Sequence, residues 1–401
     1  MRDGGFLDPR GLGLAPGLGA GGPASFDALG FRGAFSGDGR SALRAGLAWV
    51  DGFVPAARGA LQDQGSLSVR RQRPSGGGRA DGIPLGEPRR ARDRDGPRFD
   101  QRVPPGGYAW WYCDAISDDG AFGLTIIGFV GSVFSPYYKI TGRGRPENHA
   151  AINVALYGRG ARRWAMTERG EKAVSRGPSH FQVGPSAMHW DGNCLTIEID
   201  EVTPLLPKRV RGTVKLHPQA LLNHPMPLDR HGRHCWWPIA PCARVEADFS
   251  APNLSWRGHG YLDFNTGAEP LEASFSRWNW SRASVPGGTA VLYDLRTREG
   301  EDVSLAILFD PKSGVTDFAP PPKTTLITSV WRMARETRSE DRDRTVVLKT
   351  LEDSPFYARS LVKATLFGER TVAMHESLDL DRFRNPIVQS MLPYRMPRRF
   401  F

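Results

Sequence analysis

The stretch from His234 to Trp280 places residues capable of acid chemistry among electron-rich rings. His234 and Trp236 lie two residues apart, and so do Tyr261 and Asp263. On a β-strand, side chains at this spacing point to one face, so we expect each pair to share a surface. A carboxyl group beside indole and phenol rings suits protonation of a carbon–carbon double bond. The rings would then stabilise the carbocation through their quadrupoles.

The same residues also have ordinary structural explanations. A lone aspartate is more often a turn or surface residue, although His259 and Tyr261 on the same strand face as Asp263 make a buried acid about equally reasonable. Tandem tryptophans such as Trp236 and Trp237 usually fill the space between packed units. Both interpretations of this stretch stay open from its residues alone.

Other chemistries have weaker support. His231 and His234 supply two of the three ligands that a metal needs, so no metal site is predicted. Alternating acids such as Glu198 and Asp200 usually face solvent, and His189 with Asp191 is an equally weak acid–base candidate. We find no phosphate-binding glycine loop that opens a helix and no GxSxG nucleophile motif, whereas paired carboxylates for glycoside hydrolysis stay open.

Length and composition bound the class of protein. The 401 residues can form two ordinary domains or one large one, and 11 Trp with 20 Phe are typical of a β-protein or an apolar pocket. The net charge of +10 admits nucleic acid or an anionic lipid surface as a partner, although neither follows from charge alone. The 4 cysteines form no CxxC pair and are expected to be buried thiols in a reducing compartment.

The apolar runs are too short for a transmembrane helix. The longest, 124–134, is broken by glycine and falls well below the ~20 residues that a spanning helix needs. The amino terminus has neither a charged-then-apolar leader nor a small-residue cleavage site, which predicts a cytoplasmic protein.

Residues 1–100 differ in composition from the rest of the chain. They are rich in Gly, Arg, Pro and Ala, and the first lysine of the sequence is Lys139. Such a segment buries too little apolar area to offset its ordering entropy, so we predict a disordered tail, with a short helix considered at 41–50.

From about residue 103 the pattern predicts antiparallel β-structure. Residues 108–113 alternate, a polar turn follows at 117–120, and a second apolar run completes a hairpin. Further alternating runs recur at intervals of about ten residues, as in sandwiches and barrels. They are 151–157, 163–167, 180–183, 187–190, 194–200 and 211–216, then 244–248, 256–265, 273–280, 290–295, 303–309, 330–334, 345–351 and 357–366.

This count predicts two barrel-like domains, 101–243 and 244–401. We expect them to join near residues 234–242, because Pro238 and Pro241 favour a connection over a strand. Trp278 and Trp280 are expected on one face of their strand, opposite Arg277 and Asn279.

Three segments carry a resemblance to a known family. They are GGYAWWYCDAISDDG, HCWWPIAPCARVEADF and WRGHGYLDFNTGAEPL. The chain resembles the CrtC/AttH-like, lipocalin-related family of carotenoid 1,2-hydratases, or hydroxyneurosporene synthases, from about residue 103 to its end, with residues 1–100 outside the likeness. The resemblance implies two calycin-type, lipocalin-like β-barrel domains. It also implies a cofactor-independent enzyme that adds water to the terminal C1=C2 bond of acyclic carotenoids such as neurosporene and lycopene.

The family's active-site pattern falls on His234, Trp236, Tyr261 and Asp263. This implies that Asp263, kept neutral by an apolar site, protonates C2, and that Trp236 and Tyr261 stabilise the cation at C1. His234 would hydrogen-bond Asp263 or orient the attacking water. Trp237, Trp278 and Trp280 are assigned to substrate binding.

The implied substrate also predicts a location. A long polyene is insoluble in water, so the enzyme must collect it from a bilayer, and peripheral association with the photosynthetic inner membrane is expected. The basic balance and the rings in 133–140 or 398–401 are the predicted contacts with anionic lipid. No nucleic-acid partner and no oligomeric state are predicted. A noncatalytic carrier of hydrophobic ligands and a carbohydrate-active β-protein are the alternatives.

Overall fold

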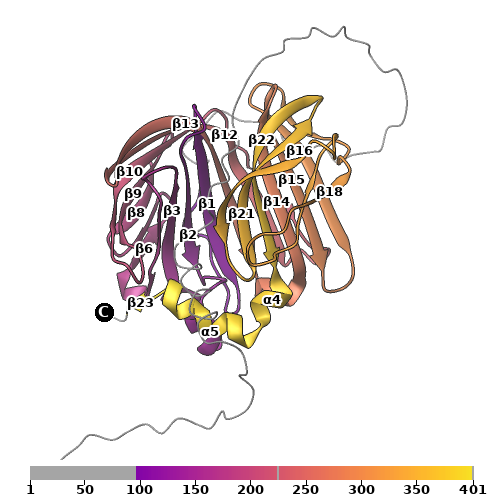
Figure 1. Ribbon diagram of the computed structural model, residues 1–401. Helices are drawn as coiled ribbons and strands as arrows, with labels where there is room; N and C mark the ends of the chain where they lie inside the picture. The colour runs from indigo at the N-terminus through magenta and orange to yellow at the C-terminus, as the bar shows by residue number, and fades with distance from the viewer. Residues whose placement is uncertain (1–95, 224, 400–401) are drawn as a thin grey trace, which may run out of the picture. The chain divides into compact units, whose positions relative to one another are not determined.

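The structure is a computed structural model that describes residues 96–223 and 225–399 (Figure 1). The described residues belong to one compact unit. The predictions for residues 1–95, including most of the disordered tail and the short helix, lie outside them, as do residues 400–401.

Most of the described chain forms antiparallel strands, which confirms the all-β prediction. A 14-stranded sheet has the order β23-β5-β3-β2-β1-β13-β12-β10-β9-β8-β7-β6, with β11 and β4 paired off this path. Its strands are β1 (Tyr108–Ser117), β2 (Gly123–Val130), β3 (Ala150–Tyr157), β4 (Arg163–Met166), β5 (Glu168–Arg169), β6 (Val174–Gly177), β7 (His180–Val183), β8 (Ser186–Trp190), β9 (Leu195–Val202), β10 (Arg209–Pro218), β11 (Met226–Pro227), β12 (His234–Ala251), β13 (Asn253–Gly267) and β23 (Arg398–Arg399).

A second sheet follows in the chain. It has 7 strands in the order β17-β16-β15-β14-β22-β21-β20, and a separate 2-stranded sheet pairs β18 with β19. The strands are β14 (Phe275–Val285), β15 (Gly288–Thr297), β16 (Asp302–Asp310), β17 (Gly314–Asp317), β18 (Lys323–Leu326), β19 (Arg335–Arg338), β20 (Val346–Asp353), β21 (Tyr357–Leu366) and β22 (Glu369–Asp379).

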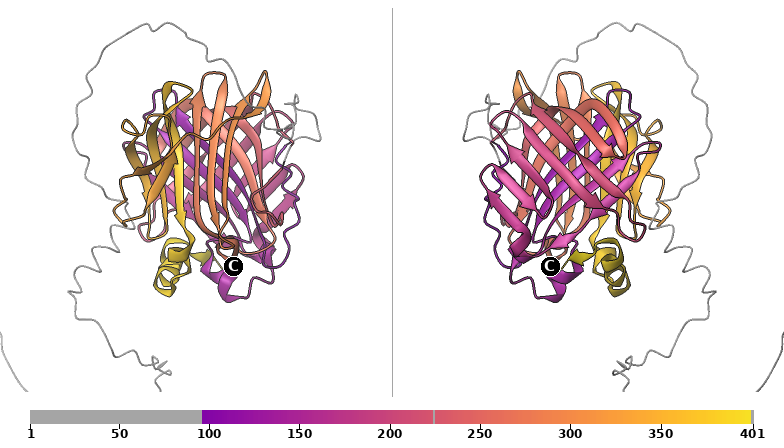
Figure 2. Two further views of the ribbon diagram at one scale, coloured as in Figure 1. Left: turned by 90° about the vertical axis from the view of Figure 1, so that its right-hand side faces the viewer. Right: turned by 90° about the vertical axis from the view of Figure 1, so that its left-hand side faces the viewer.

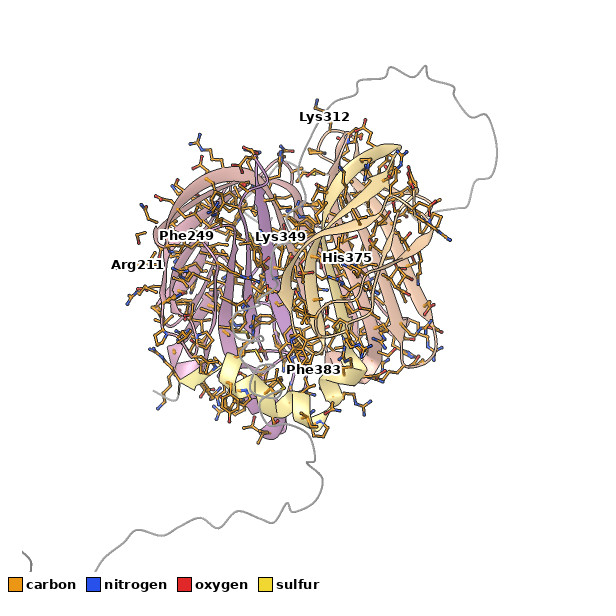
Figure 3. The ribbon with its side chains drawn as sticks, viewed as in Figure 1. Arg211, Phe249, Lys312, Lys349, His375 and Phe383 are labelled. Carbon is orange, nitrogen blue, oxygen red and sulfur yellow. The ribbon has the colours of Figure 1, made fainter. Side chains whose placement is uncertain are left out.

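Short helices complete the structure. They are α2 (Pro136–Ile140), α3 (Leu271–Ser274), α4 (Leu380–Arg384) and α5 (Pro386–Arg395), with 3₁₀ turns η1 (Pro146–Asn148) and η2 (Glu171–Ala173). Side chains cap α4 and α5, because Asp379 accepts the Arg382 backbone N–H and Asn385 accepts that of Ile387. Both helices lie at one end of the strands (Figure 2). Phe383 of α4 lies at the same end (Figure 3).

The centre of the first sheet is buried on both faces. In β13, Leu262 and Phe264 pack into the core enclosed by the first sheet, whereas Tyr261 points into the aromatic core that the first sheet shares with the second. The same alternation in β1 sends Trp111 to one core and Tyr112 to the other. An antiparallel strand covered on both faces is expected to be apolar almost without interruption, as β1 is.

The segment with two prolines is a strand and not a connection. β12 runs through both Pro238 and Pro241, and its pairing with β13 shifts between Trp237 and Ala240 and again between Ala240 and Ala243. Such irregularities are where a sheet accommodates proline, which cannot donate to the ladder. The expectation that residues 234–242 join the two units is therefore wrong. The change of sheet comes between β13 and β14, and the predicted junction of 243 and 244 falls inside β12.

Some of the other predicted elements are present in the structure and others are not. The hairpin at 108–120 is confirmed, since β1 pairs antiparallel with β2. The run at 330–334 is not a strand, because it lies in the loop between β18 and β19. β22 and the helices α4 and α5 were not predicted.

Candidate active site

Asp263 lies at the centre of the core between the two sheets. Its strand, β13, is flanked by β1 and β12, and Tyr112 is its direct neighbour on β1. The side-chain oxygen Oδ2 accepts hydrogen bonds from the Trp236 indole N–H and the Tyr261 hydroxyl, both at 2.8 Å. The predicted association of Asp263 with Trp236 and Tyr261 is thus present in the structure.

Burial keeps this carboxyl group neutral. Asp263 is 2% exposed, and removal from water raises its pKa from 3.8 to about 8 despite the two hydrogen bonds, which lower it. The nearby charges of Glu376 and Asp114 raise the pKa further. At neutral pH Asp263 is therefore mainly an acid with a proton to give.

The hydrogen bonds also decide which oxygen carries the proton. Oδ2 already accepts from two donors, whereas Oδ1 is buried and has no hydrogen-bond partner. The neutral acid therefore holds its proton on Oδ1. After transfer, the two donors remain in place to stabilise the carboxylate on Oδ2.

Aromatic rings surround this acid. Tyr261 packs against Trp280 with ring centroids 5.3 Å apart, and Trp236 packs against Tyr293 at 5.0 Å. Tyr112 lies 5.3 Å from Trp280 and 6.2 Å from Tyr261. The π-faces and edges of these rings form an environment that can stabilise a cation close to Asp263.

A buried ion pair supports the two tyrosines. Arg282 of β14 binds Asp114 of β1 through Nε at 2.7 Å, and both side chains are at most 3% exposed. The hydroxyl of Tyr112 donates to Asp114 at 3.0 Å, and the Arg282 guanidinium lies 5.8 Å from the centre of the Tyr261 ring. This pair joins the two sheets directly beside the acid.

An open pocket adjoins the aromatic core and encloses about 900 Å³ of space not filled by atoms, its mouth included. Its walls are largely apolar, with Trp110, Ile127, Phe129, Phe134, Trp164, Met166, Leu271, Trp278, Phe356, Leu378, Leu392 and Met396. Tyr112 lines the pocket and Asp263 does not. The acid therefore lies one ring behind the pocket wall.

Charged residues line another part of this pocket. Arg359 of β21 binds Glu376 of β22 at 2.9 Å and also binds Glu352, and the Tyr357 hydroxyl is buried without a hydrogen-bond partner. Glu376 is the cross-strand neighbour of Trp280. These residues were not predicted, because nothing in the local pattern of β21 and β22 indicates which core they face.

His234 does not contact Asp263, contrary to one predicted role. Its Nδ1 bonds the Tyr108 hydroxyl at 2.9 Å, and its Nε2 has no hydrogen-bond partner. His234 pairs with Gly267 in the sheet, four residues beyond Asp263, which is about 13 Å along a strand. Burial lowers the pKa of this histidine, which therefore favours the neutral imidazole.

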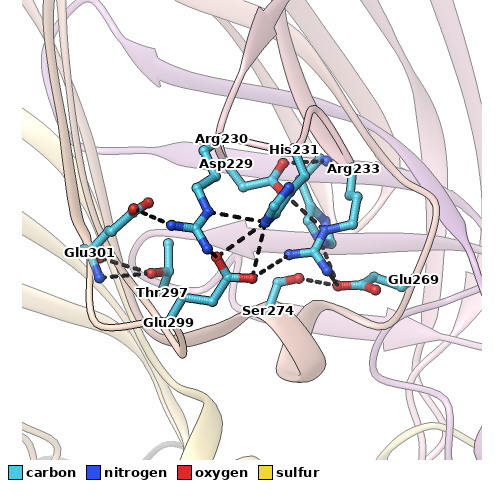
Figure 4. A network of polar contacts seen from close by, with 10 residues as sticks. Asp229, Arg230, His231, Arg233, Glu269, Ser274, Thr297, Glu299 and Glu301 are labelled. Atoms are coloured by element: carbon cyan, nitrogen blue, oxygen red, sulfur yellow. Dashed lines mark hydrogen bonds and ion pairs between the residues drawn. The ribbon is translucent and has the colours of Figure 1, made fainter.

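The basic residues before His234 belong to a surface network (Figure 4). Arg233 binds Asp229 at 3.1 Å, and Asp229 accepts the backbone N–H of His234 at 3.0 Å. His231 faces Glu299 at 3.2 Å. This network attaches the start of β12 to the β15–β16 turn and gives the charged side chains of this run their partners.

The predicted substrate-binding tryptophans separate into two groups. Trp278 lines the pocket, and Trp280 packs on Tyr261 and Tyr112. Trp237 instead points into the other core, where its indole N–H donates to the Leu222 carbonyl at 2.7 Å. Its assignment to this site is wrong, because consecutive residues of a strand face opposite ways.

The weaker candidates lie away from the acid. His259 is exposed and lies near Asp118 and Arg244, although it shares a strand with Asp263. Asp191 caps a turn by accepting the backbone N–H groups of Asn193 and Cys194.

The cysteines are free thiols, of which Cys113, Cys194 and Cys242 are buried and Cys235 is partly buried.

The described residues contain neither a cluster of metal ligands nor a helix that could span a membrane. Within residues 96–223 and 225–399, no three His, Cys, Asp or Glu side chains gather as a metal would require. No helix in the same ranges has the length and hydropathy to cross a bilayer.

The fold and site define an all-β protein with a neutral acid held among aromatic rings beside an apolar pocket. The family model described as carotenoid hydratase CrtC matches residues 126–401, and the chain belongs to this family. It is 51% identical over 369 residues to the acyclic carotenoid 1,2-hydratase of Thiocapsa roseopersicina, covering 91% of each chain. It is 48% identical over 379 residues to the enzyme of the same name from Rubrivivax gelatinosus, covering 93% of each chain.

These alignments extend further than the predicted likeness. Because an alignment over 91% of the chain must include part of residues 1–100, the expectation that this segment lies outside the likeness is wrong. Among solved structures, a putative AttH from Nitrosomonas europaea matches with a TM-score of 0.47 and 14% identity, over 68% of this chain and 92% of that one.

Proposed function

We propose that this protein is a hydratase that adds water across the terminal C1=C2 bond of acyclic carotenoids such as neurosporene and lycopene. The observation that carries the proposal is the neutral Asp263, with a pKa of about 8 and an unpartnered Oδ1 among aromatic rings. The names of the relatives from Thiocapsa and Rubrivivax support the same activity.

The first step is proton transfer to the alkene. The π electrons of C1=C2 take the proton from Oδ1 of Asp263, which forms the C2–H bond and leaves a tertiary cation at C1. Trp236 and Tyr261 keep their hydrogen bonds to Oδ2 and stabilise the new carboxylate. Each desolvated cation–π contact with the surrounding rings contributes about 2 kcal/mol, which corresponds to a factor of tens in rate.

The second step is attack by water. A water oxygen bonds to C1, and one of its protons returns to Asp263, so that the alkene gains one water and the acid is restored. Glu376 lines the pocket next to Trp280 and is the carboxylate placed to orient this water, while Arg359 holds it in position. His234, bonded to Tyr108, helps to position the aromatic wall without contacting the acid.

The pocket suits the rest of the polyene. Its apolar walls match a hydrocarbon chain, and its open mouth allows a long substrate to extend beyond it. Because Tyr112 lines the pocket and Asp263 does not, this mechanism requires the end of the substrate to displace the Tyr112 ring in order to reach Oδ1. The water-insoluble substrate also supports peripheral association with the inner membrane from the cytoplasmic side.

One incubation tests this function. The purified protein is mixed with detergent-solubilised lycopene, and the products are analysed by mass spectrometry. We expect the gain of one water and, in D₂O, one carbon-bound deuterium at C2. Lycopene that binds but is recovered unchanged would instead identify a noncatalytic carrier. Binding of glycans without any action on lycopene would indicate a carbohydrate-active protein.

The activity should depend on the protonated form of Asp263. Because burial raises its pKa to about 8, kcat is expected to be level below this pH and to fall about tenfold per pH unit above it. Glu376→Gln removes a negative charge that raises the pKa of Asp263, so the pH at which kcat begins to fall should decrease. Tyr261→Phe removes a hydrogen bond that lowers the pKa of Asp263, so the pH at which kcat begins to fall should increase. Shifts in the same direction for both variants would contradict this arrangement.

The two cores should respond differently to loss of a tryptophan. Trp280→Phe removes part of the ring system around the cation and should lower kcat by a factor of tens. Trp237→Phe, the matched change in the other core, should lower the free energy of unfolding with little effect on kcat. Steady-state kinetics and urea unfolding of both variants check this. If both variants lost kcat equally, the reaction would not take place in the core that contains Trp280.

A further inference from the structure

We infer that the end of the molecule carrying α2, α4, α5 and the β18–β19 loop docks on an anionic lipid bilayer, with the pocket mouth toward the lipid. The inference rests on the proposed function in one respect, since a substrate dissolved in the bilayer is the reason to dock. We call this surface the mouth face and define it as residues 137–140, 327–332, 380–384 and 386–395. Figures 1 and 2 show α4 and α5 together at this end of the strands.

Exposed apolar side chains gather on the mouth face. The five most exposed large apolar residues of the described chain all belong to it: Ile140 (81%), Ile327 (74%), Ile387 (71%), Tyr394 (68%) and Val330 (61%). Isolated exposed apolar residues are ordinary, but these come from three separate segments that α4 and α5 connect to one another. Side chains of this kind enter the boundary between headgroups and acyl chains when a protein binds a membrane peripherally.

Helix α5 contributes to the lining of the pocket, and the other segments of the mouth face contact α5 or a lining residue. Leu392 of α5 and Met396, which follows this helix, line it, and Asp353 lines it beside the β18–β19 loop. The Asp353 carboxylate accepts the backbone N–H of Trp331 at 3.2 Å, and Arg382 of α4 donates to the Trp331 carbonyl at 2.9 Å. Helix α2 packs on α5. The exposed apolar residues therefore lie on segments that are connected to the lining of the pocket that a polyene would enter.

The charges of the mouth face favour an anionic surface. Lys139, Arg332 and Arg384 are exposed, and none of them forms an ion pair with a described carboxylate. Each lies in the same segment as one of the exposed apolar residues or in the adjacent helix α4. Apolar tips flanked by unpaired basic side chains are the combination that binds bilayers containing acidic lipids.

The mouth face differs from the surface expected from the sequence. Of residues 133–140, Val133 and Tyr138 are buried in the structure and Phe134 lines the pocket, so these three side chains do not face a bilayer. Lys139 and Ile140 are the exposed members of that segment. The prediction for 398–401 falls partly on residues 400–401, outside the described residues.

Sedimentation with vesicles tests the docking surface. The full-length protein is mixed with vesicles of phosphatidylcholine alone or with phosphatidylserine added. We expect binding to the anionic vesicles that weakens with salt and falls at least tenfold in the double variant Ile140→Glu, Ile387→Glu. The matched control is Leu205→Glu, Leu206→Glu, which adds the same charge to the exposed β9–β10 hairpin, outside the pocket lining. Equal binding by both double variants, or no binding by the unmodified protein, would overturn the inference.

Hydration assays separate this inference from the proposed function. Lycopene is supplied either in detergent micelles or in anionic vesicles. The mouth-face double variant should hydrate micellar lycopene at the rate of the unmodified protein. Its hydration rate with vesicular lycopene should be at least tenfold lower than that of the unmodified protein. Vesicle binding that depends on the mouth face, without any hydrated product, would refute the proposed function and leave the docking surface standing. Equal rates for both proteins on vesicular lycopene would refute the docking surface alone.

Discussion

Asp263→Asn is expected to lower kcat for carotenoid hydration by about 10²–10⁴-fold, the usual contribution of a positioned general acid. Asparagine keeps the shape and can still accept from Trp236 and Tyr261, but it has no acidic proton to donate. The loss should not come from unfolding. Folding raises the pKa of Asp263 from 3.8 to about 8, so ionisation of this residue lowers the free energy of unfolding as the pH rises through this range. Asparagine does not ionise, so the variant does not lose stability in this way.

The matched control is Asp200→Asn on β9. Asp200 forms a surface pair with Arg209 at 2.6 Å, so the same substitution there should leave kcat unchanged. Measuring both variants with micellar lycopene, together with urea unfolding, separates chemistry from folding. If Asp263→Asn retained more than a tenth of the normal rate, another residue would have to supply the proton.

Arg282→Met is expected to lower the free energy of unfolding by about 3–5 kcal/mol, because it leaves the Asp114 carboxylate buried without its ion-pair partner. The change should also disturb Tyr112, whose hydroxyl donates to Asp114, and Tyr261, which lies beside the Arg282 guanidinium. Hydration activity should fall together with stability, since both tyrosines adjoin the acid.

A double variant distinguishes loss of a partner from loss of the pair. In Asp114→Leu, Arg282→Met no buried charge remains, so the free energy of unfolding should recover most of the loss. Arg209→Met, which breaks the exposed pair with Asp200, is the surface control and should cost no more than about 1 kcal/mol. A double variant as unstable as the Arg282→Met single variant would show that the packing of these side chains matters more than their charges.

Local pattern predicted the class of fold and the candidate residues, and the resemblance was needed to choose them as the centre of the site. Strand alternation indicated antiparallel β-structure and placed Tyr261 and Asp263 on one face, which the structure shows. The spacing of His234 and Trp236 also singled out Trp236, which donates to the same carboxylate, and the resemblance assigned these residues to an active site. These features depend on residues close in the chain or on a hairpin between neighbouring strands, and such features can be predicted from sequence.

The errors come from packing between distant strands. Trp236 and Trp237 are consecutive and face different cores, and the sequence cannot say which face the second sheet covers when both faces are apolar. The irregular pairing around Pro238 and Pro241 also hides the position of His234 relative to Asp263. Glu376 joins the site from a strand more than a hundred residues away in the chain, without a local signal.

The most direct test of the central claim is the protonation state of Asp263 in the folded protein. Infrared difference spectra of the unmodified protein minus the Asp263→Asn variant, recorded across a pH series, follow the carbonyl stretch of the protonated carboxyl group. A neutral acid behind Tyr112 predicts that this band is present at pH 7 and disappears with a midpoint near pH 8. A band that is already lost by pH 5 would show that Asp263 is an ordinary carboxylate and would contradict the proposed mechanism.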